Sequence, residues 1–304
     1  MLREPPIGVA IIGVWNISNH CAAIAKVGAI RLVGVAREGK KRQDLPPGVH
    51  IFSNYAEIID NPHVQGLIFL TSATEREYWI EQGVLAGKHI LCSLPPASNC
   101  GRTREIVKSC MSQGVYLSLY AGFDFPNHKA TISSIIRKRK IGTFLYFDMK
   151  VVIPSAALLH EREGALLLYA LPYLYFFHLF GEVDTIKAQT RSLGNNRPTE
   201  NLAIVQIKFK NGLEGHFYLN GLGEREGVLI NLHGSNGSIE LKSDEYSSPE
   251  VLKSYYNEFA ELAQRGGEPL FGAEEIASGQ YYLDWLQKAA RLDKEILRDE
   301  ARIQ

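Results

Sequence analysis

Residues 13–18 have the sequence Gly-Val-Trp-Asn-Ile-Ser and follow an apolar run, a place where phosphate-binding turns are found. A turn that holds a dinucleotide needs glycine first for its bend and again where the backbone touches the pyrophosphate. Gly13 meets the first need and Ser18 is small enough to replace the third glycine, but Trp15 occupies the place of the second. The indole would either collide with the pyrophosphate or stack on a ring of the cofactor. A turn that no longer binds dinucleotide is therefore the open alternative.

A basic run, Arg37-Glu-Gly-Lys-Lys-Arg42, follows the next apolar segment. Proteins that bind NADP tend to place arginine near the phosphate on the ribose, because a guanidinium can hold a phosphate with two hydrogen bonds. The run therefore favours NADP over NAD. The alternative interpretation is a solvated basic loop without a ligand.

The elements that must position these residues alternate between strand and helix over the first 120 residues. Strands are predicted at 7–13, 30–36, 65–71, 89–92 and 115–120, and helices at 18–27, 55–59, 75–86 and 102–113. Such alternation predicts a parallel, doubly wound sheet that binds ligands at the carboxyl ends of its strands. The candidate cofactor-binding residues are Gly13, Val14, Trp15, Asn16, Ile17, Arg37, Thr71, Ser72 and Ser93.

The pattern changes after residue 121. A helix at 127–137 is followed by strands at 143–153, 185–191, 202–208, 215–219, 228–233 and 238–241, which are separated by turns. An apolar helix at 164–180 can pack on this sheet, and residues 249–265 and 273–298 are expected to be helical. We predict a Rossmann-type NAD(P)-binding domain (α/β) at 1–121 and a domain with an open, mainly antiparallel sheet and packed helices (α+β) at 122–304.

The composition argues against several classes of protein. Lys+Arg 33 and Asp+Glu 33 leave no net charge to attract nucleic acid or a membrane surface. The four cysteines lack CxxC spacing, so we expect free thiols in a reducing compartment and no metal site. Neither a signal peptide nor an apolar run of about 18 residues is present. We therefore expect a cytoplasmic protein.

Several different short motifs are distributed along nearly the whole chain. They are Ile11-Ile-Gly-Val14, Ala86-Gly-Lys-His-Ile90, Phe125-Pro126, Lys140-Ile-Gly142, Gly164-Ala-Leu-Leu167, Phe180-Gly-Glu-Val183, Asn211-Gly-Leu213 and the segment 232–240. Together they resemble the Gfo/Idh/MocA family of nicotinamide-dependent sugar and polyol oxidoreductases, and two of them resemble its biliverdin reductase branch. The resemblance implies NADP or NAD as cofactor, a small-molecule substrate or ligand, and a homodimer or homotetramer formed through the C-terminal sheet.

The chain departs from the family at the catalytic positions. In the family the fourth strand ends in Glu-Lys-Pro, and its lysine helps to polarise the reacting hydroxyl; the matching segment here has Leu94 in place of that lysine. The family aspartate and histidine, four residues apart on one helix face, correspond to Leu168 and Pro172, with one residue of uncertainty in the register. Arg76 stands where the family has a histidine after the third strand.

Other residues could replace the lost proton donors. Tyr169 and Tyr173 lie on the same predicted helix, although aromatic residues at this density are often core. His160, with Glu161 and Arg162, precedes the helix where family members bring a loop to the substrate, and a solvated loop is the alternative. We expect His20 to be structural.

Two functions remain open. The first is an NADPH-linked reductase of a small unsaturated substrate, since hydride delivery to a conjugated acceptor depends less on a lysine that deprotonates an alcohol. The second is a non-catalytic pseudoenzyme that acts as a binding, regulatory or assembly module, in which case no cofactor need bind.

Overall fold

The computed structural model describes residues 4–13, 16–36, 45, 49–123, 125–154, 165–193, 200–244 and 248–301. The chain forms two units, each with its own sheet. The first unit contains Met1–Gly122 and Ser247–Ala277, and the second contains Phe123–Tyr246 and Ser278–Gln304. No helix in the described ranges is long and apolar enough to span a membrane.

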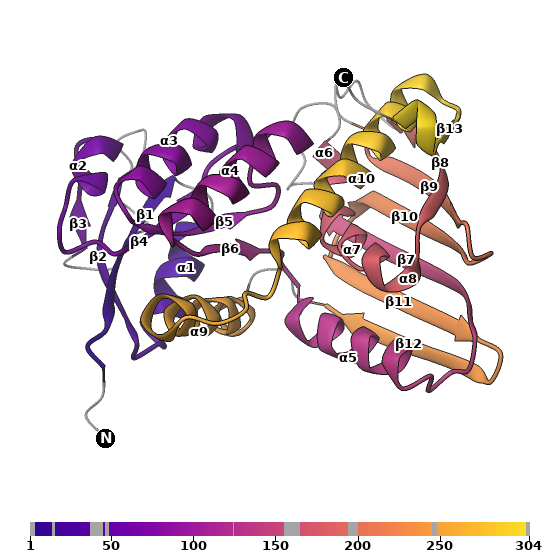
Figure 1. The fold of residues 1–304 in the computed structure, drawn as a ribbon, viewed down its shortest axis with the longest axis horizontal. Helices are drawn as coiled ribbons and strands as arrows, with labels where there is room; N and C mark the ends of the chain where they lie inside the picture. The colour runs from indigo at the N-terminus through magenta and orange to yellow at the C-terminus, as the bar shows by residue number, and fades with distance from the viewer. Residues whose placement is uncertain are drawn as a thin grey trace. The chain divides into compact units, whose positions relative to one another are not determined.

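The first unit is built on a parallel six-stranded sheet (Figure 1). Its strand order is β3-β2-β1-β4-β5-β6, formed by His50–Ile51, Ile30–Ala36, Ile7–Gly13, Gly66–Leu70, His89–Ser93 and Leu117–Tyr120. Strands β1 and β4 are buried along their whole length, which explains their continuous apolar sequences. The doubly wound sheet predicted from the sequence is confirmed, and the two-residue β3 was not predicted.

Helices cover both faces of this sheet. They are α1 (Ile17–Ile24), α2 (Tyr55–Ile59), α3 (Ala73–Leu85) and α4 (Cys100–Gln113). The strand order reverses between β1 and β4, and in open α/β sheets ligands bind beyond the carboxyl ends of the strands at such a reversal. The fold therefore predicts a ligand site at the carboxyl ends of β1, β4 and β5.

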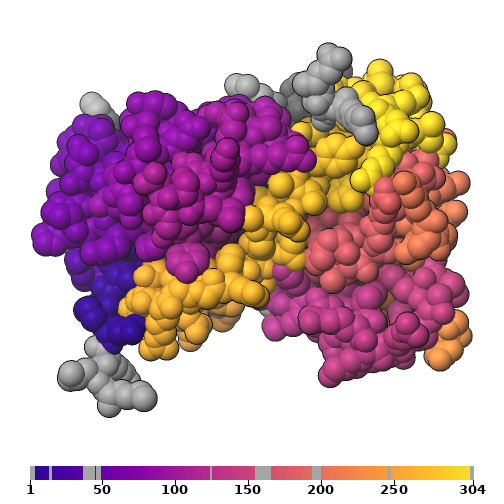
Figure 2. All heavy atoms as spheres, in the orientation of Figure 1, coloured from indigo at the N-terminus to yellow at the C-terminus, as the bar shows by residue number. Residues whose placement is uncertain are grey.

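A helix from far along the chain completes the first unit. Helix α9 (Pro249–Arg265) packs against α1, β1 and β6 and buries a row of apolar residues that includes Tyr256 and Phe259. At its end Arg265 pairs with Glu4, and Figure 2 shows the golden atoms of α9 beside the indigo start of the chain. The cover of the parallel sheet thus includes residues that follow β6 by more than a hundred positions.

The second unit contains a seven-stranded sheet in the order β12-β11-β7-β10-β9-β8-β13. The strands are β7 (Phe144–Pro154), β8 (Val183–Arg191), β9 (Leu202–Phe209), β10 (Glu214–Gly223), β11 (Gly227–Gly234), β12 (Gly237–Ser243) and β13 (Glu295–Leu297). Only the β7–β10 pair is parallel among the pairs described, so the mainly antiparallel sheet is confirmed. Helix α5 (Phe125–Arg137) precedes the sheet in the chain.

Two helix predictions in this unit were wrong. The segment predicted as one helix at 164–180 forms the short helices α6 (Ala165–Leu168), α7 (Leu171–Leu174) and α8 (Phe177–Phe180). Pro172 lies in the first turn of α7, and because proline has no N–H and clashes with the preceding turn, a helix from α6 cannot continue through it.

The second wrong prediction concerns residues 273–298. Helix α10 (Ala273–Leu292) ends before Asp293, which has a left-handed φ of 47°. The chain then forms β13 on β8 and a short 3₁₀ helix, η2 (Arg298–Ala301). The Trp285 indole donates to the carbonyl of the buried Ile296 at 3.1 Å, which holds β13 against α10.

Candidate functional site

Gly13 ends β1 at the reversal of strand order. Its φ is +114°, and a Cβ at this position would lie 2.3 Å from the carbonyl oxygen of Leu70 at the end of β4. Both the conformation and the close approach exclude a side chain. The glycine predicted to begin a phosphate-binding turn therefore lies where the fold places a ligand.

The start of α1 follows directly. Asn16, at the N-cap of α1, has a left-handed conformation (φ 50°, ψ 31°) and makes no side-chain cap hydrogen bond, whereas Asn54, Ser72 and Asn99 cap the next three helices with their side chains. The first turn of α1 also contains no acidic residue. A helix start of this kind favours an anion, because its N–H groups and dipole are positive. Val14 and Trp15 lie outside the described residues.

Two buried hydroxyls lie at the ends of the neighbouring strands. Thr71 Oγ1 follows β4 and Ser93 Oγ ends β5, and neither has a hydrogen-bond partner among the described residues. Ser72, the other predicted contact here, uses its hydroxyl to cap α3 at Glu75 N. A buried hydroxyl without a partner is unfavourable by about 1–3 kcal/mol. A ligand with donors and acceptors at this edge would satisfy both groups, so the residues fit a dinucleotide.

Arg76 joins the ends of β4 and β5. Its guanidinium is 1% exposed and donates to four backbone carbonyls, those of Thr71, Ser72, Ser93 and Pro95. Burial lowers the pKa of Arg76, and the neighbouring Cys92 thiol offsets part of this effect. The sequence placed Arg76 where the family has a histidine but did not predict this role. Arg76 fixes the backbone that carries the two unpartnered hydroxyls.

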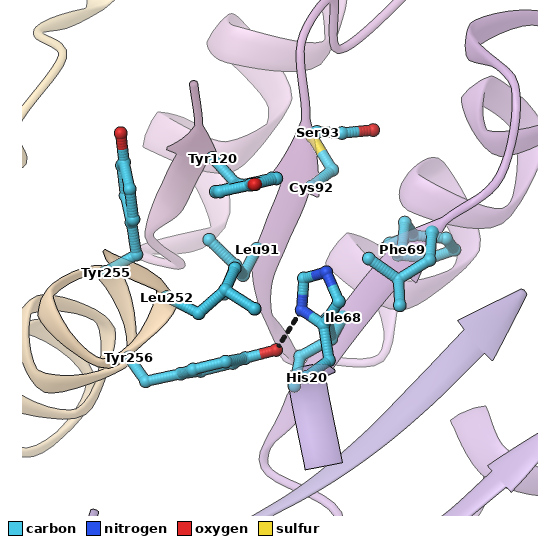
Figure 3. A pocket seen from close by; sticks show the side chains of 11 residues that line it. His20, Ile68, Phe69, Leu91, Cys92, Ser93, Tyr120, Leu252, Tyr255 and Tyr256 are labelled. Carbon is cyan, nitrogen blue, oxygen red and sulfur yellow. Dashed lines mark hydrogen bonds between the residues drawn. The ribbon is translucent and has the colours of Figure 1, made fainter. Parts of the chain in front are cut away.

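A small hollow lies on the α1 and α9 side of the same strands (Figure 3). Leu70, Ser93 and Tyr120, the last residues of β4, β5 and β6, line it together with His20 of α1 and Tyr256 of α9. Nδ1 of His20 lies 2.6 Å from the Tyr256 hydroxyl. Burial lowers the pKa of His20 to about 3, so the ring is neutral near pH 7. Sequence reasoning missed the hollow, because a single histidine in a helix gives no signal for it.

The second unit contains the predicted catalytic tyrosines. Tyr173 is 1% exposed and packs in an aromatic cluster, with its ring centroid 6.1 Å from that of Phe125, and Tyr169 is partly exposed after α6. Leu168 ends α6 and Pro172 is buried in α7. A catalytic role for either tyrosine stays a prediction.

Several predicted contacts lie outside the described residues, namely Arg37, His160, Glu161 and Arg162. All four cysteines are free and buried. Within the described ranges, no group of three His, Cys, Asp or Glu side chains could hold a metal ion.

Known proteins resemble the chain over the same elements. The model of the "Oxidoreductase family, NAD-binding Rossmann fold" matches residues 7–121. Galactose 1-dehydrogenase of Pseudomonas fluorescens is 33% identical over 106 residues, which are 34% of each chain. Trans-1,2-dihydrobenzene-1,2-diol dehydrogenase of Sus scrofa is 22% identical over 76% of this chain and 70% of its own.

Solved structures share the fold of both units. A probable dehydrogenase from Thermotoga maritima has a TM-score of 0.83 at 15% identity and covers 97% of this chain and 100% of its own. The WlbA dehydrogenase of Bordetella pertussis, solved in complex with NADH and UDP-GlcNAcA, has a TM-score of 0.80 at 19% identity over 96% and 98% of the two chains.

Proposed function

We propose that this chain, which belongs to the Gfo/Idh/MocA family of oxidoreductases, is an NADPH-linked reductase of a small unsaturated substrate. The observation that carries the proposal is the pair of unpartnered hydroxyls of Thr71 and Ser93, at the edge where Gly13 lets β1 approach β4 closely and Leu94 replaces the family lysine.

The residues of the first unit divide the binding task. The start of α1, where Asn16 makes no side-chain cap, would hold the pyrophosphate, which is the anionic part of a dinucleotide. Thr71 and Ser93 would donate to or accept from the remainder of the cofactor, and Arg76 holds the backbone of both residues in place. When bound, the reduced nicotinamide supplies the hydride. The basic run 37–42 motivates the choice of NADPH over NADH.

Leu94 determines the kind of substrate. Oxidation of an alcohol needs a group that takes up the hydroxyl proton, and leucine cannot do so. A conjugated double bond that accepts hydride becomes an enolate, which can take its proton from water, so the main demand on the protein is orientation and electrostatic support of the negative charge. The family members whose names specify an alcohol or diol substrate are therefore imperfect guides to this chain.

A pseudoenzyme is the second candidate, and a specific observation favours it. Leu94, Leu168 and Pro172 all stand where the family has residues that move protons, and none of the three can ionise. In this case the parallel sheet would bind a dinucleotide without turnover, or would bind none and serve as an assembly module.

Calorimetric titration with NADPH and with NADH, followed by turnover assays with conjugated aldehydes and ketones, tests these candidates. The reductase predicts micromolar binding that favours NADPH, and NADPH oxidation with at least one acceptor. Binding without turnover across the panel supports the pseudoenzyme. No binding of either dinucleotide in the wild-type protein would contradict the reductase.

We also propose that two copies of the chain associate through the outward face of the seven-stranded sheet. Ile204 and Tyr218 are cross-strand partners on this face and are 48% and 38% exposed. Beside them the strand register aligns a polar row across all seven strands: Glu240, Asn231, Asp148, His216, Gln206, Lys187 and Glu295. An apolar strip next to charges of both signs suits a self-complementary contact.

Light scattering after size exclusion tests the association. We expect a dimer or tetramer for the wild type, and Ile204→Arg should shift it to the monomer. Met111→Arg is the control, because Met111 is 70% exposed on α4 of the first unit and should leave the mass unchanged. A monomeric wild type, or an oligomer that tolerates Ile204→Arg, would contradict the proposal.

A further inference from the structure

His20 contributes a buried ring to the hollow at the ends of β4, β5 and β6. The side chain is 3% exposed, and Figure 3 shows the Tyr256 hydroxyl directed at one of its ring nitrogens, Nδ1. The other nitrogen, Nε2, has no hydrogen-bond partner within the part of the chain that the structure describes. Unlike the enclosed hydroxyls of Thr71 and Ser93, Nε2 is not a fully buried atom, so a group that enters the hollow can reach it.

The Tyr256 hydroxyl decides which nitrogen carries the proton. Tyr256 is 0% exposed, and burial raises its pKa well above the usual value, so it remains a phenol. Its O–H must find an acceptor, because a buried donor without one is costly. Among the described residues only His20 Nδ1 is within reach. The phenol therefore donates to Nδ1, and the proton of the neutral ring lies on Nε2.

The walls of the hollow restrict what Nε2 can meet. Ile68, Leu91 and Leu252 are apolar, and no described residue that lines the hollow carries a formal charge. The enclosed part has room for about one water molecule. A ligand can therefore insert one small, uncharged polar group there, and that group must accept a hydrogen bond.

We propose that this hollow receives the neutral carbonyl or carboxamide oxygen of a bound ligand, which accepts the Nε2 proton of His20. The inference rests on the proposed dinucleotide binding, because the hollow lies at the same strand ends as Thr71 and Ser93. A neutral imidazole N–H can polarise a carbonyl group, so His20 supplies an electrostatic contact from the first unit in a chain that lacks the family lysine.

The oxygen can come from two sources. One is the carboxamide of the nicotinamide, in which case His20 orients the cofactor. The other is the carbonyl of a conjugated substrate, in which case His20 polarises the acceptor. Both offer the same chemistry to Nε2, so binding experiments must separate them.

Nitrogen-15 NMR of the histidine rings tests the tautomer in the wild-type protein. The expected result is a protonated Nε2 and a bare Nδ1 for His20, with a change in the Nε2–H signal when NADPH is added. A bare Nε2 would overturn the inference without bearing on dinucleotide binding. In Tyr256→Phe the proton of the His20 ring should no longer be confined to Nε2, because the ring then loses the donor to Nδ1.

Calorimetry with His20→Phe separates the two sources. If the nicotinamide is the acceptor, the variant binds NADPH roughly tenfold more weakly, and its affinity for 2′-phospho-ADP-ribose, which lacks the nicotinamide, is unchanged. If the substrate is the acceptor, NADPH binding is unchanged, and cinnamaldehyde binds the NADP⁺-loaded variant more weakly than the loaded wild type.

Unchanged binding in both arms would overturn the inference, as would an equal loss for NADPH and 2′-phospho-ADP-ribose, which would indicate a purely structural His20. The variant Tyr256→Phe removes the same link between α1 and α9 but keeps an imidazole that can still carry a proton on Nε2, so it should lose less affinity than His20→Phe; an equal loss in both variants would indicate that only the link between the helices matters. If the wild type binds neither NADPH nor 2′-phospho-ADP-ribose, the proposed function itself fails. That outcome is distinct from the losses named above.

Discussion

Nη1 of Arg76 donates to the carbonyl oxygen of Pro95 at a distance of 3.2 Å. Arg76 lies in the first turns of α3, which follows β4, whereas Pro95 lies in the segment that follows β5. A guanidinium buried in this way substitutes for the water that would otherwise satisfy the carbonyls at the edge of the sheet.

Replacement of Arg76 by alanine should therefore be severe. We expect Arg76→Ala to lower the free energy of unfolding by roughly 3–5 kcal/mol, because buried carbonyls lose their donor. Urea denaturation measures the change. Arg102→Ala is the control: Arg102 pairs with Glu77, Glu81 and Glu105 at the surface, and its loss should cost below about 1 kcal/mol. Similar costs for both variants would contradict the assigned role.

Gly13→Ala tests the close approach of β1 to β4. The new Cβ would meet the Leu70 carbonyl, and the φ of +114° is unfavourable for alanine. We therefore expect the free energy of unfolding to fall by roughly 2 kcal/mol or more, and dinucleotide binding to be lost. Gly28→Ala is the matched control, because nothing lies within 4 Å of its Cβ position. Thermal unfolding and calorimetry report the two effects, and a fully stable, binding Gly13→Ala would refute the prediction.

Thr71→Val should change stability and affinity in opposite directions. Valine keeps the shape and removes a hydroxyl that has no partner in the described structure, so the free protein should gain up to about 1 kcal/mol. NADPH binding should weaken, because the ligand loses a partner at the strand end. Thr103→Val in α4 removes another buried hydroxyl without a described partner, and it should stabilise the protein without changing affinity. Equal NADPH affinities of both variants and the wild type would show that the Thr71 hydroxyl does not contact the ligand.

The low pKa of His20 makes stability depend on pH. In the folded protein the pKa is about 3, and in the unfolded chain it is about 6.5, so between these values the unfolded chain binds a proton that the folded protein does not. The contribution of His20 to the free energy of unfolding is therefore fully present above pH 6.5, and it decreases as the pH falls below that value. From pH 7.5 to pH 5 the wild type should lose about 2 kcal/mol more than His20→Gln. An equal loss of stability in the two proteins between pH 7.5 and pH 5, measured by denaturation, would contradict this assignment.

The strands of the first unit could be predicted from the sequence because parallel strands are buried on both faces. Ile7–Gly13 and Ile30–Ala36 match the predicted ranges, since each is a nearly continuous apolar run that ends in a small residue. The placement of Gly13, Thr71 and Ser93 at strand ends also follows from the sequence, because topology alone brings such positions to one edge, and their contact with a cofactor stays a prediction.

The features that were missed depend on contacts that no local pattern encodes. The segment 164–180 is apolar almost throughout, so it contains no period that could reveal its division into α6, α7 and α8. Strand β13 has a single buried residue, Ile296, and owes its existence to pairing with β8. Arg76 and His20 become informative only when the strand ends and α9 surround them.

Because α9 comes late in the sequence, the first unit cannot complete its folding until most of the chain has been synthesised. On the ribosome all six strands of the first sheet have been made when residue 122 appears, but the helix that covers β1 and β6 is complete only near residue 265. At about 5–20 residues per second, this part of the sheet waits for roughly 7–30 s. During this interval an apolar face is exposed to other nascent chains. A chaperone that holds this face until α9 arrives would raise the yield of native protein without altering its stability.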